Sequence, residues 1–92
     1  MTAVTVRSFA KFRELFGEEK RLDVPHASTI YDALILFAGE TPAAQTGLFE
    51  NGSLRPHVVI MYNKERIDTE DASEIVLEDG AEIVLYPPVS GG

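Results

Sequence analysis

The segment STIYDALILFAG, residues 28–39, carries the one long helical pattern in this sequence. Its apolar residues recur at spacings of three and four, which is typical of a helix with one buried face. They are Ile30, Ala33, Leu34 and Phe37, and we expect Ile35 and Leu36 to widen the stripe. Thr29 followed by Asp32 has the pattern of a capping box, which predicts the helix start, and Gly39 is the expected stop.

Two short strands are predicted before this helix. The segment AVTVRSF, residues 3–9, alternates with the two-residue period of a strand. The segment KRLDV, residues 20–24, is the second strand. Between them, FAKFRELF fits one or two helical turns that end at Gly17.

The end of the first strand leaves two positions open for Phe9. If the alternation continues, Phe9 lies on the polar face of the sheet with Arg7. If the strand ends at Ser8, Phe9 turns inward to the core.

The chain after the long helix is predicted to form a loop and then further strands. Residues 40–57 hold Pro42, Gly47, Asn51-Gly52 and Pro56, which predict a turn-rich loop attached to the core by Leu48 and Phe49. The apolar run VVIMY, residues 58–62, predicts a central strand covered on both faces. The acidic residues between 68 and 74 are expected in a solvated loop.

The last strand is predicted over residues 82–86, where Ile83 and Leu85 alternate with Val84 and Tyr86. The order strand, strand, helix, strands predicts an α+β fold, with one face of a mixed sheet of four to five strands packed on one main helix. Phe9, Val84 and Tyr86 are candidates for the second face. A cluster of apolar residues there, beside a functional tail, would mark an interface.

Composition narrows the class of protein. The 92 residues are 45% hydrophobic, which suits one domain with one core, and there is no cysteine for disulfides or thiolate chemistry. No basic leader and no long apolar segment is present, so we expect a soluble, cytoplasmic protein. The net charge of −7 disfavours binding to nucleic acid or to an anionic membrane.

The motif search indicates that the chain is not an enzyme. His26 and His57 stand alone, without the spacing of metal ligands, and we expect structural or surface roles for them. The acidic residues between 70 and 79 lack the ligand spacing of a calcium loop. No metal site and no nucleophile–base pair is predicted, and the group with a special setting is the Gly92 carboxylate.

The ending YPPVSGG, residues 86–92, is predicted to be an arm rather than part of the core. Pro87 and Pro88 favour a stiff, extended path, and Gly91 and Gly92 make the tip slender and flexible. Such an arm suits insertion into the active site of another protein, and the alternative is a frayed tail. We therefore expect one domain over residues 1–86 and a flexible tail over residues 87–92.

These residues resemble the β-grasp, ubiquitin-like sulfur carriers. That family includes the small subunit of molybdopterin synthase, the thiamine-pathway sulfur carrier and the small archaeal modifier proteins. The strongest segment is LEDGAEIVLYPPVSGG, residues 77–92, which is similar to the family's last strand and Gly-Gly ending. Phe9-Ala10 with Arg13-Glu14-Leu15, and Leu54–Val58 with Asn63, resemble its opening and middle. The resemblance implies a ubiquitin-like β-grasp fold.

The resemblance also implies a function in which partners perform the chemistry. An E1-like enzyme would use ATP and Mg²⁺ to adenylate the carboxylate of Gly92, and the chain itself would hold no cofactor. The activated carboxyl would then become a thiocarboxylate, or would be joined to lysines of target proteins. The implied partners are the E1-like enzyme, the large subunit of molybdopterin synthase and the target lysines.

The same resemblance assigns expected roles to single residues. Gly91, Ser90, Val89, Pro88 and Pro87 would thread the tail into the partner. Phe9 and Tyr86 match positions of an aromatic contact on the exposed sheet face. Arg66 stands where some relatives carry an apolar residue of that patch, so a smaller or more polar patch is expected here.

Two other functions remain open from the sequence. The chain could serve as a dedicated small subunit of molybdopterin synthase in molybdenum cofactor biosynthesis. It could also be a plain interaction module that binds through its exposed sheet and carries an inert tail. The ending V-S-G-G and the acidic balance favour the modifier proteins over the dedicated subunit.

Overall fold

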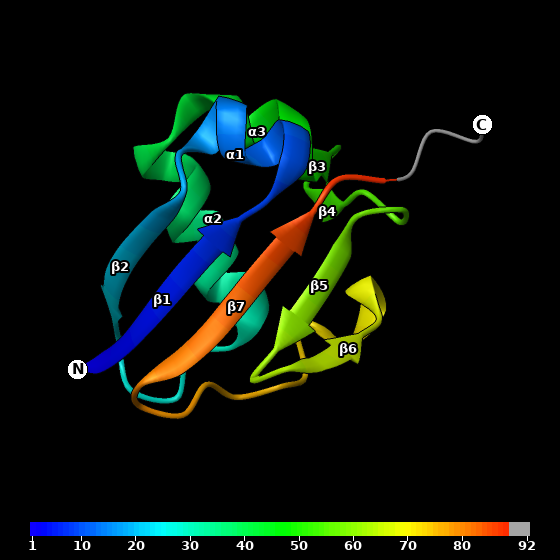
Figure 1. Cartoon of the computed structure of the whole chain (residues 1–92). Coiled ribbons are helices and arrows are strands. Elements are labelled where there is room, and N and C mark those ends of the chain that lie inside the picture. Colours follow the sequence, from blue (N-terminus) through cyan, green and yellow to red (C-terminus); the bar gives the residue numbers. More distant parts are fainter. Residues whose placement is uncertain (89–92) are drawn as a thin grey trace.

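One mixed sheet, with helices packed against one of its faces, forms the molecule (Figure 1). The computed structural model describes residues 1–88, so Val89–Gly92, including the predicted Gly-Gly arm, lie outside the described part. The elements in chain order are β1 (Thr2–Ser8), α1 (Ala10–Phe16), β2 (Glu19–Val24), α2 (Ile30–Glu40), α3 (Pro42–Leu48), β3 (Phe49–Glu50), β4 (Ser53–Leu54), β5 (Val59–Tyr62), β6 (Glu65–Ile67), a 3-10 turn (Thr69–Asp71) and β7 (Ala81–Tyr86).

The last strand of the chain lies at the centre of the sheet. The strand order is β2-β1-β7-β5-β6, in which β1 and β7 are parallel and all other neighbours are antiparallel. Val4 of β1 is paired with Ala81 of β7. The prediction of an α+β fold with a mixed sheet of four to five strands is confirmed, with five strands.

The face of the sheet that points to the helices forms the core, and we call it the inner face. Alternate residues of β1, β5 and β7 lie there with at most 1% of their surface exposed, namely Val4, Val6, Ile60, Ile83 and Leu85. Ile30, Leu34 and Phe37 of α2 belong to the same buried cluster. Full burial of one such side chain stabilises the fold by about 1.5–3 kcal/mol.

The predicted capping box at the start of α2 is confirmed. The Thr29 hydroxyl accepts a hydrogen bond from the Asp32 backbone N–H at 3.1 Å, and the Asp32 carboxylate accepts one from the Thr29 N–H at 3.0 Å. The helix ends at Glu40, one residue beyond the predicted stop at Gly39.

The predicted width of the buried stripe on α2 is wrong. Ile35 and Leu36 are 44% and 38% exposed, while Ala38 is buried instead. Each residue advances about 100° around a helix, so the two side chains point away from a face already filled by Ile30, Leu34 and Phe37.

The prediction of a loop over residues 40–57 is also wrong in part. Pro42 begins α3 instead of a turn, because proline fits the first turn of a helix, where its missing N–H costs nothing. Gly47 lies inside α3, where a Cβ would come within 2.7 Å of the Phe16 ring. Asn51-Gly52 makes the expected tight turn between β3 and β4, and Leu48 and Phe49 are buried as predicted.

The strand β5 is less covered than its apolar sequence predicts. Ile60 is fully buried, but Val59, Met61 and Tyr62 are half-buried, so this strand is not covered on both faces. The central place belongs to β7, and β5 lies between β7 and β6. Within residues 1–88, no helix is long and apolar enough to cross a membrane.

Candidate functional site

The face of the sheet opposite the helices, which we call the outer face, is open in Figure 1. The strand register brings its residues together: Val84 of β7 lies between Arg7 of β1 and Met61 of β5. Tyr86 is paired with Val59, and Arg66 of β6 is paired with Met61. The outer face therefore combines an apolar centre with charged flanks.

A shallow groove of about 260 Å³ crosses this face, and we call it the outer groove. Val84 and Met61 provide its apolar part, and Val84 is only 9% exposed. The groove is lined by Arg7, Phe9, Met61, Lys64, Glu82, Val84 and Tyr86. Its size suits one inserted side chain of a partner protein rather than a small-molecule ligand.

Phe9 and Tyr86 form a stacked aromatic pair at one end of the outer groove. Their ring centroids are 5.1 Å apart and their planes differ by 15°. The Phe9 backbone N–H donates to the Leu85 carbonyl at 3.1 Å, which ties the start of α1 to the end of β7. The rings are 37% and 39% exposed, so a large aromatic surface is available here.

Each of the two positions predicted for Phe9 from the sequence is partly right. The strand does end at Ser8, because Phe9 has an extended backbone and stands at the N-cap of α1. Its side chain nevertheless points to the outer groove beside Arg7 and does not turn inward. The stacking with Tyr86 accounts for this position.

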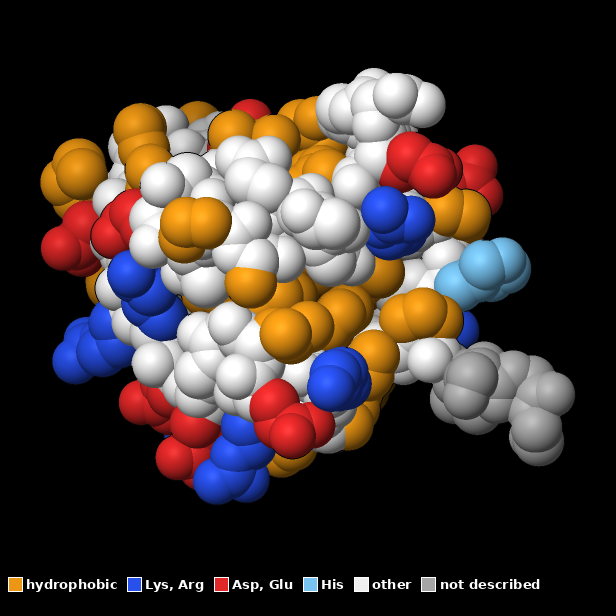
Figure 2. Space-filling view, turned by 90° about the horizontal axis from the view of Figure 1, so that it is seen from above, with side chains coloured by type: hydrophobic (Ala, Val, Ile, Leu, Met, Phe, Trp, Pro, Cys, Tyr) orange, Lys and Arg blue, Asp and Glu red, His pale blue; other side chains and the backbone are white. Residues whose placement is uncertain are grey.

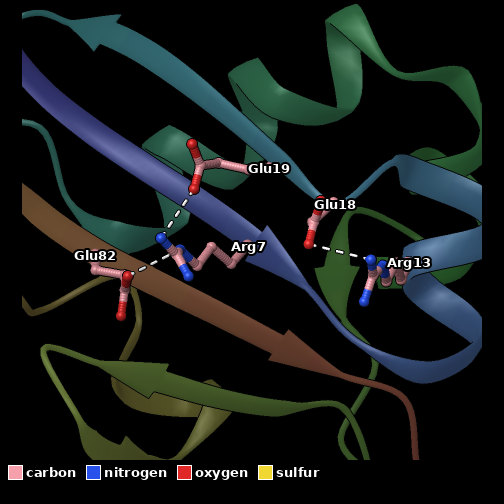
Figure 3. A network of polar contacts seen from close by, with 5 residues as sticks. All are labelled: Arg7, Arg13, Glu18, Glu19 and Glu82. Carbon is pink, nitrogen blue, oxygen red and sulfur yellow. Dashed lines mark ion pairs between the residues drawn. The ribbon is translucent and has the colours of Figure 1, made fainter.

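Arg7 joins three strands across the outer face (Figure 3). Its Nε lies 3.1 Å from a Glu82 carboxylate oxygen, and its Nη2 lies 3.0 Å from a Glu19 oxygen. A separate pair joins Arg13 and Glu18 at 3.1 Å. These groups are a third or more exposed, so each pair contributes at most about 1 kcal/mol to stability. The Arg7 pairs instead fix the orientation of its side chain.

The root of the tail lies beside a second hollow. Pro87 and Pro88 follow β7, and Pro88 lines a space of about 420 Å³ together with Pro56, His57, Val59 and Arg66. We call this space the tail-root hollow. Arg66 is therefore placed next to the tail root and does not line the outer groove with Phe9 and Tyr86.

The remaining predicted tail residues are not placed. Val89, Ser90, Gly91 and Gly92, including the residue expected to be activated, lie outside the described residues. Their roles stay predictions.

The sequence reasoning missed Met61 and Lys64 of the outer groove, and it named Glu82 only as the start of the last strand. Met61 was assigned to a strand covered on both faces, although the alternation with Ile60 could have placed it outward. Lys64 was read only as part of a turn. That turn holds two residues, and both Asn63 and Lys64 have positive φ angles, 48° and 74°.

Among residues 1–88, the polar side chains show neither a buried atom without a partner nor a cluster of metal-ligand type. Across residues 1–88, every buried side-chain nitrogen or oxygen has a hydrogen-bond partner. In the same range, no three His, Asp or Glu side chains come together as metal ligands would. His26 and His57 are exposed.

The surface above the helices carries charges of both signs. Seen from above, the face over α1 and α3 shows acidic, basic and hydrophobic side chains interspersed (Figure 2). Neither sign of charge forms a continuous area there.

Comparison with known proteins finds a matching family and several similar proteins. A family model described as the ThiS family matches residues 6–92. The chain is 32% identical over 90 residues to small archaeal modifier protein 3 of Haloferax volcanii, covering 95% of this chain and 96% of that protein. The crystal structure of small archaeal modifier protein 1 from the same organism superposes with a TM-score of 0.87 at 33% identity, covering 98% and 99% of the two chains.

A third similar structure is itself part of a complex. It contains subunits 1 and 2 of the molybdopterin-converting factor of Helicobacter pylori. The matching chain is 25% identical, with a TM-score of 0.63 over 99% of this chain and all of that one.

Proposed function

Because the chain belongs to the ThiS family, we propose that it is a ubiquitin-like sulfur carrier and protein modifier that acts through the Gly92 carboxylate. Proteins of this family are carriers rather than enzymes. The single observation that carries the proposal is that the family match runs through residue 92 and so includes the PPVSGG ending.

The chemistry follows from the poor reactivity of a carboxylate. An E1-like enzyme with Mg²⁺ and ATP would join the Gly92 carboxyl to AMP and release pyrophosphate. A sulfur nucleophile then attacks the acyl-adenylate, and AMP leaves. A terminal sulfide donor would give a thiocarboxylate, whereas a cysteine of the partner would give a thioester. A lysine amine that displaces this cysteine forms an isopeptide bond.

The outer face supports the docking step of this proposal. The outer groove offers an apolar contact, and the pair Phe9–Tyr86 lies one residue before the two prolines of the tail root. Packing of Tyr86 against Phe9 fixes the point from which Pro87 and Pro88 leave the sheet. A partner that binds the groove would therefore receive the tail from a defined position and direction.

Deletion of Gly91 and Gly92 is the direct test. With the E1-like enzyme of the same cell, the truncated chain should give no ATP–pyrophosphate exchange and no conjugates, while its circular dichroism and melting temperature match the wild type. Ser90→Ala is the matched control and should keep exchange, since alanine is as small as serine. Unchanged exchange or conjugation in the truncated chain would refute the function.

A second candidate is the dedicated small subunit of molybdopterin synthase. The likeness to one chain of the two-subunit Helicobacter pylori complex favours it. It predicts a stable complex with the large synthase subunit and no attachment to lysines. Mass spectrometry of cellular proteins decides, because a Gly-Gly remnant on lysine excludes a purely dedicated subunit. An inert-tail interaction module, in contrast, predicts no pyrophosphate exchange at all.

A further inference from the structure

The backbone of Lys64 is in an unfavourable conformation. Asn63 and Lys64 form the two-residue turn between β5 and β6, with φ angles of 48° and 74°. Such a turn requires positive φ at both positions, which asparagine tolerates at the first and which favours glycine at the second. A lysine with its Cβ is strained there. Stability alone would favour glycine at this position. The presence of lysine therefore indicates a role for its side chain other than in folding.

The turn is fixed against the central strand of the sheet. The Asn63 N–H donates to the Glu82 carbonyl at 2.9 Å, and the Asn63 side-chain oxygen accepts from the Glu82 N–H at 2.9 Å. Both bonds hold the turn beside β7, where Lys64 lines the outer groove. Lys64 is thereby kept at the edge of the groove.

Lys64 and Arg66 carry charges that the described residues do not neutralise. Among residues 1–88, ion pairs within 4.0 Å involve Arg7, Arg13, Lys20 and Arg55, but neither of these two cations. The nearby carboxylate of Glu82 is already paired with Arg7. Glu65 is paired with Tyr62 in the register, so it falls on the face opposite to Arg66.

The two cations border the outer face at different points. Lys64 lines the outer groove and Arg66 lines the tail-root hollow together with Pro88. The chain as a whole has a net charge of −7. The turn that holds Lys64 lies beside Glu82, at the end of β7 away from the tail root, whereas Arg66 lies at the tail root. Two cations without an ion pair among residues 1–88 therefore border the outer face of an acidic protein, and they are complementary to an anionic surface.

We propose that Lys64 and Arg66 form a basic lip on the β5–β6 hairpin that binds carboxylates on the surface of the activating enzyme, when that surface covers the outer face. A protein surface fits better than a nucleic acid, because the net charge of −7 repels a polyanion. This inference rests on the proposed function and specifies the chemistry of the partner surface.

A pair of charge-reversed variants tests the lip. The first is Lys64→Glu with Arg66→Glu. The control matched in charge is Lys20→Glu with Arg21→Glu on β2, at the opposite edge of the sheet, and its melting temperature is measured as well because it breaks the Lys20–Glu40 ion pair. Each double variant lowers the net charge by the same four units, so general repulsion is equal in both.

The readout is ATP–pyrophosphate exchange with varied carrier concentration. The first variant should raise KM by about tenfold or more with little change in kcat, and the control should raise it by less than about twofold. Raising the salt concentration should increase the wild-type KM and lower that of the first variant, because salt screens the attraction in one and the repulsion in the other. Equal changes of KM in the two double variants, or a wild-type KM that does not depend on salt, would contradict the proposed role of the lip.

Lys64→Gly separates recognition from folding. Removal of the strain should raise the melting temperature, while loss of the charge should raise KM by several-fold. Lys64→Arg keeps the charge and should keep KM near the wild-type value. An unchanged KM in Lys64→Gly would show that the lysine has no docking role.

Failure of the lip and failure of the proposed function give different results. A wild-type chain that supports no exchange overturns both. Exchange in the wild type with equal behaviour of the two double variants overturns only the lip. Retention on immobilised DNA that is lost with Lys64→Glu and Arg66→Glu would assign the lip to nucleic acid and would also overturn it.

Discussion

The two faces of the one sheet differ in what their side chains contact. On β7, Ile83 and Leu85 of the inner face are fully buried against the helices. Tyr86 of the outer face is exposed and stacks on Phe9, while Val84 is covered only by the side chains of the outer groove. One strand thus provides both core residues and residues of the proposed docking surface. Substitutions on one face should therefore change stability, and substitutions on the other should change partner binding.

The largest expected effect contrasts two neighbouring residues of β7. Leu85→Ala leaves a cavity in the core and should lower the free energy of unfolding by about 2–5 kcal/mol. Tyr86→Ala, one residue further, should cost about 1.5 kcal/mol or less, since its ring is 39% exposed. Urea denaturation measures both. Similar losses from the two substitutions would contradict the division between the faces.

The next largest change in stability is expected from a substitution in the helices that cover the inner face. Gly47→Ala should cost about 1–3 kcal/mol, because the new Cβ meets the Phe16 ring at 2.7 Å. That ring cannot easily move, since it packs on the rings of Phe12 and Phe37, with distances between ring centroids of 4.7 Å and 5.9 Å.

Gly39→Ala on α2 is the matched control. No atom lies within 4 Å of its new Cβ, so alanine should stabilise the helix by about 0.5–1 kcal/mol. Thermal unfolding of the two variants should therefore shift in opposite directions. A stabilised Gly47→Ala would mean that the Phe16 ring is free to move.

A smaller effect is expected from the aromatic pair of the outer face. A double-mutant cycle with Phe9→Leu and Tyr86→Leu should give a coupling energy of about 0.5–1.5 kcal/mol in unfolding. The same substitutions should raise KM in pyrophosphate exchange, since both rings face the proposed partner. A coupling energy near zero would mean that the stacking contributes nothing to the root of the tail.

The smallest effect is expected at Arg7. Arg7→Gln should lower stability by no more than about 1 kcal/mol at low salt, and by less at 1 M salt, because its two ion pairs are exposed to solvent. Arg13→Gln, which breaks a single exposed pair, is the comparison. A loss above about 2 kcal/mol at Arg7 would mean that the outer face contributes to stability as the inner face does.

Local patterns predicted the helix α2 and the strands well, because both signals depend on neighbouring residues. The capping box at Thr29 and the alternation of Ile83 and Leu85 are such signals. Ile35 and Leu36 misled the prediction because hydrophobicity alone does not specify which apolar residues a neighbour covers. Pro42 misled it because proline serves equally in a turn and in the first turn of a helix.

The site was predictable where strand alternation or family resemblance pointed to a residue. Phe9 and Tyr86 were named in this way, but their mutual stacking depends on the parallel pairing of β1 and β7. Arg66 was expected on the same face, where the register pairs it with Met61, and its position beside Pro88 was not predicted. Lys64 carried no sequence signal beyond its turn, since its positive φ is visible only in the folded backbone.

The pairing of β1 with β7 has a consequence for the order of folding. Val4 and Ala81 are neighbours in the sheet although almost the whole chain separates them, so this contact closes a long loop and should form late. The β1–β2 hairpin and the helices can form before it. The outer groove cannot, because Val84 of β7 and Arg7 of β1 both line it. A partner that binds this groove would therefore not bind incompletely folded chains. Binding would then also select for chains that have folded completely.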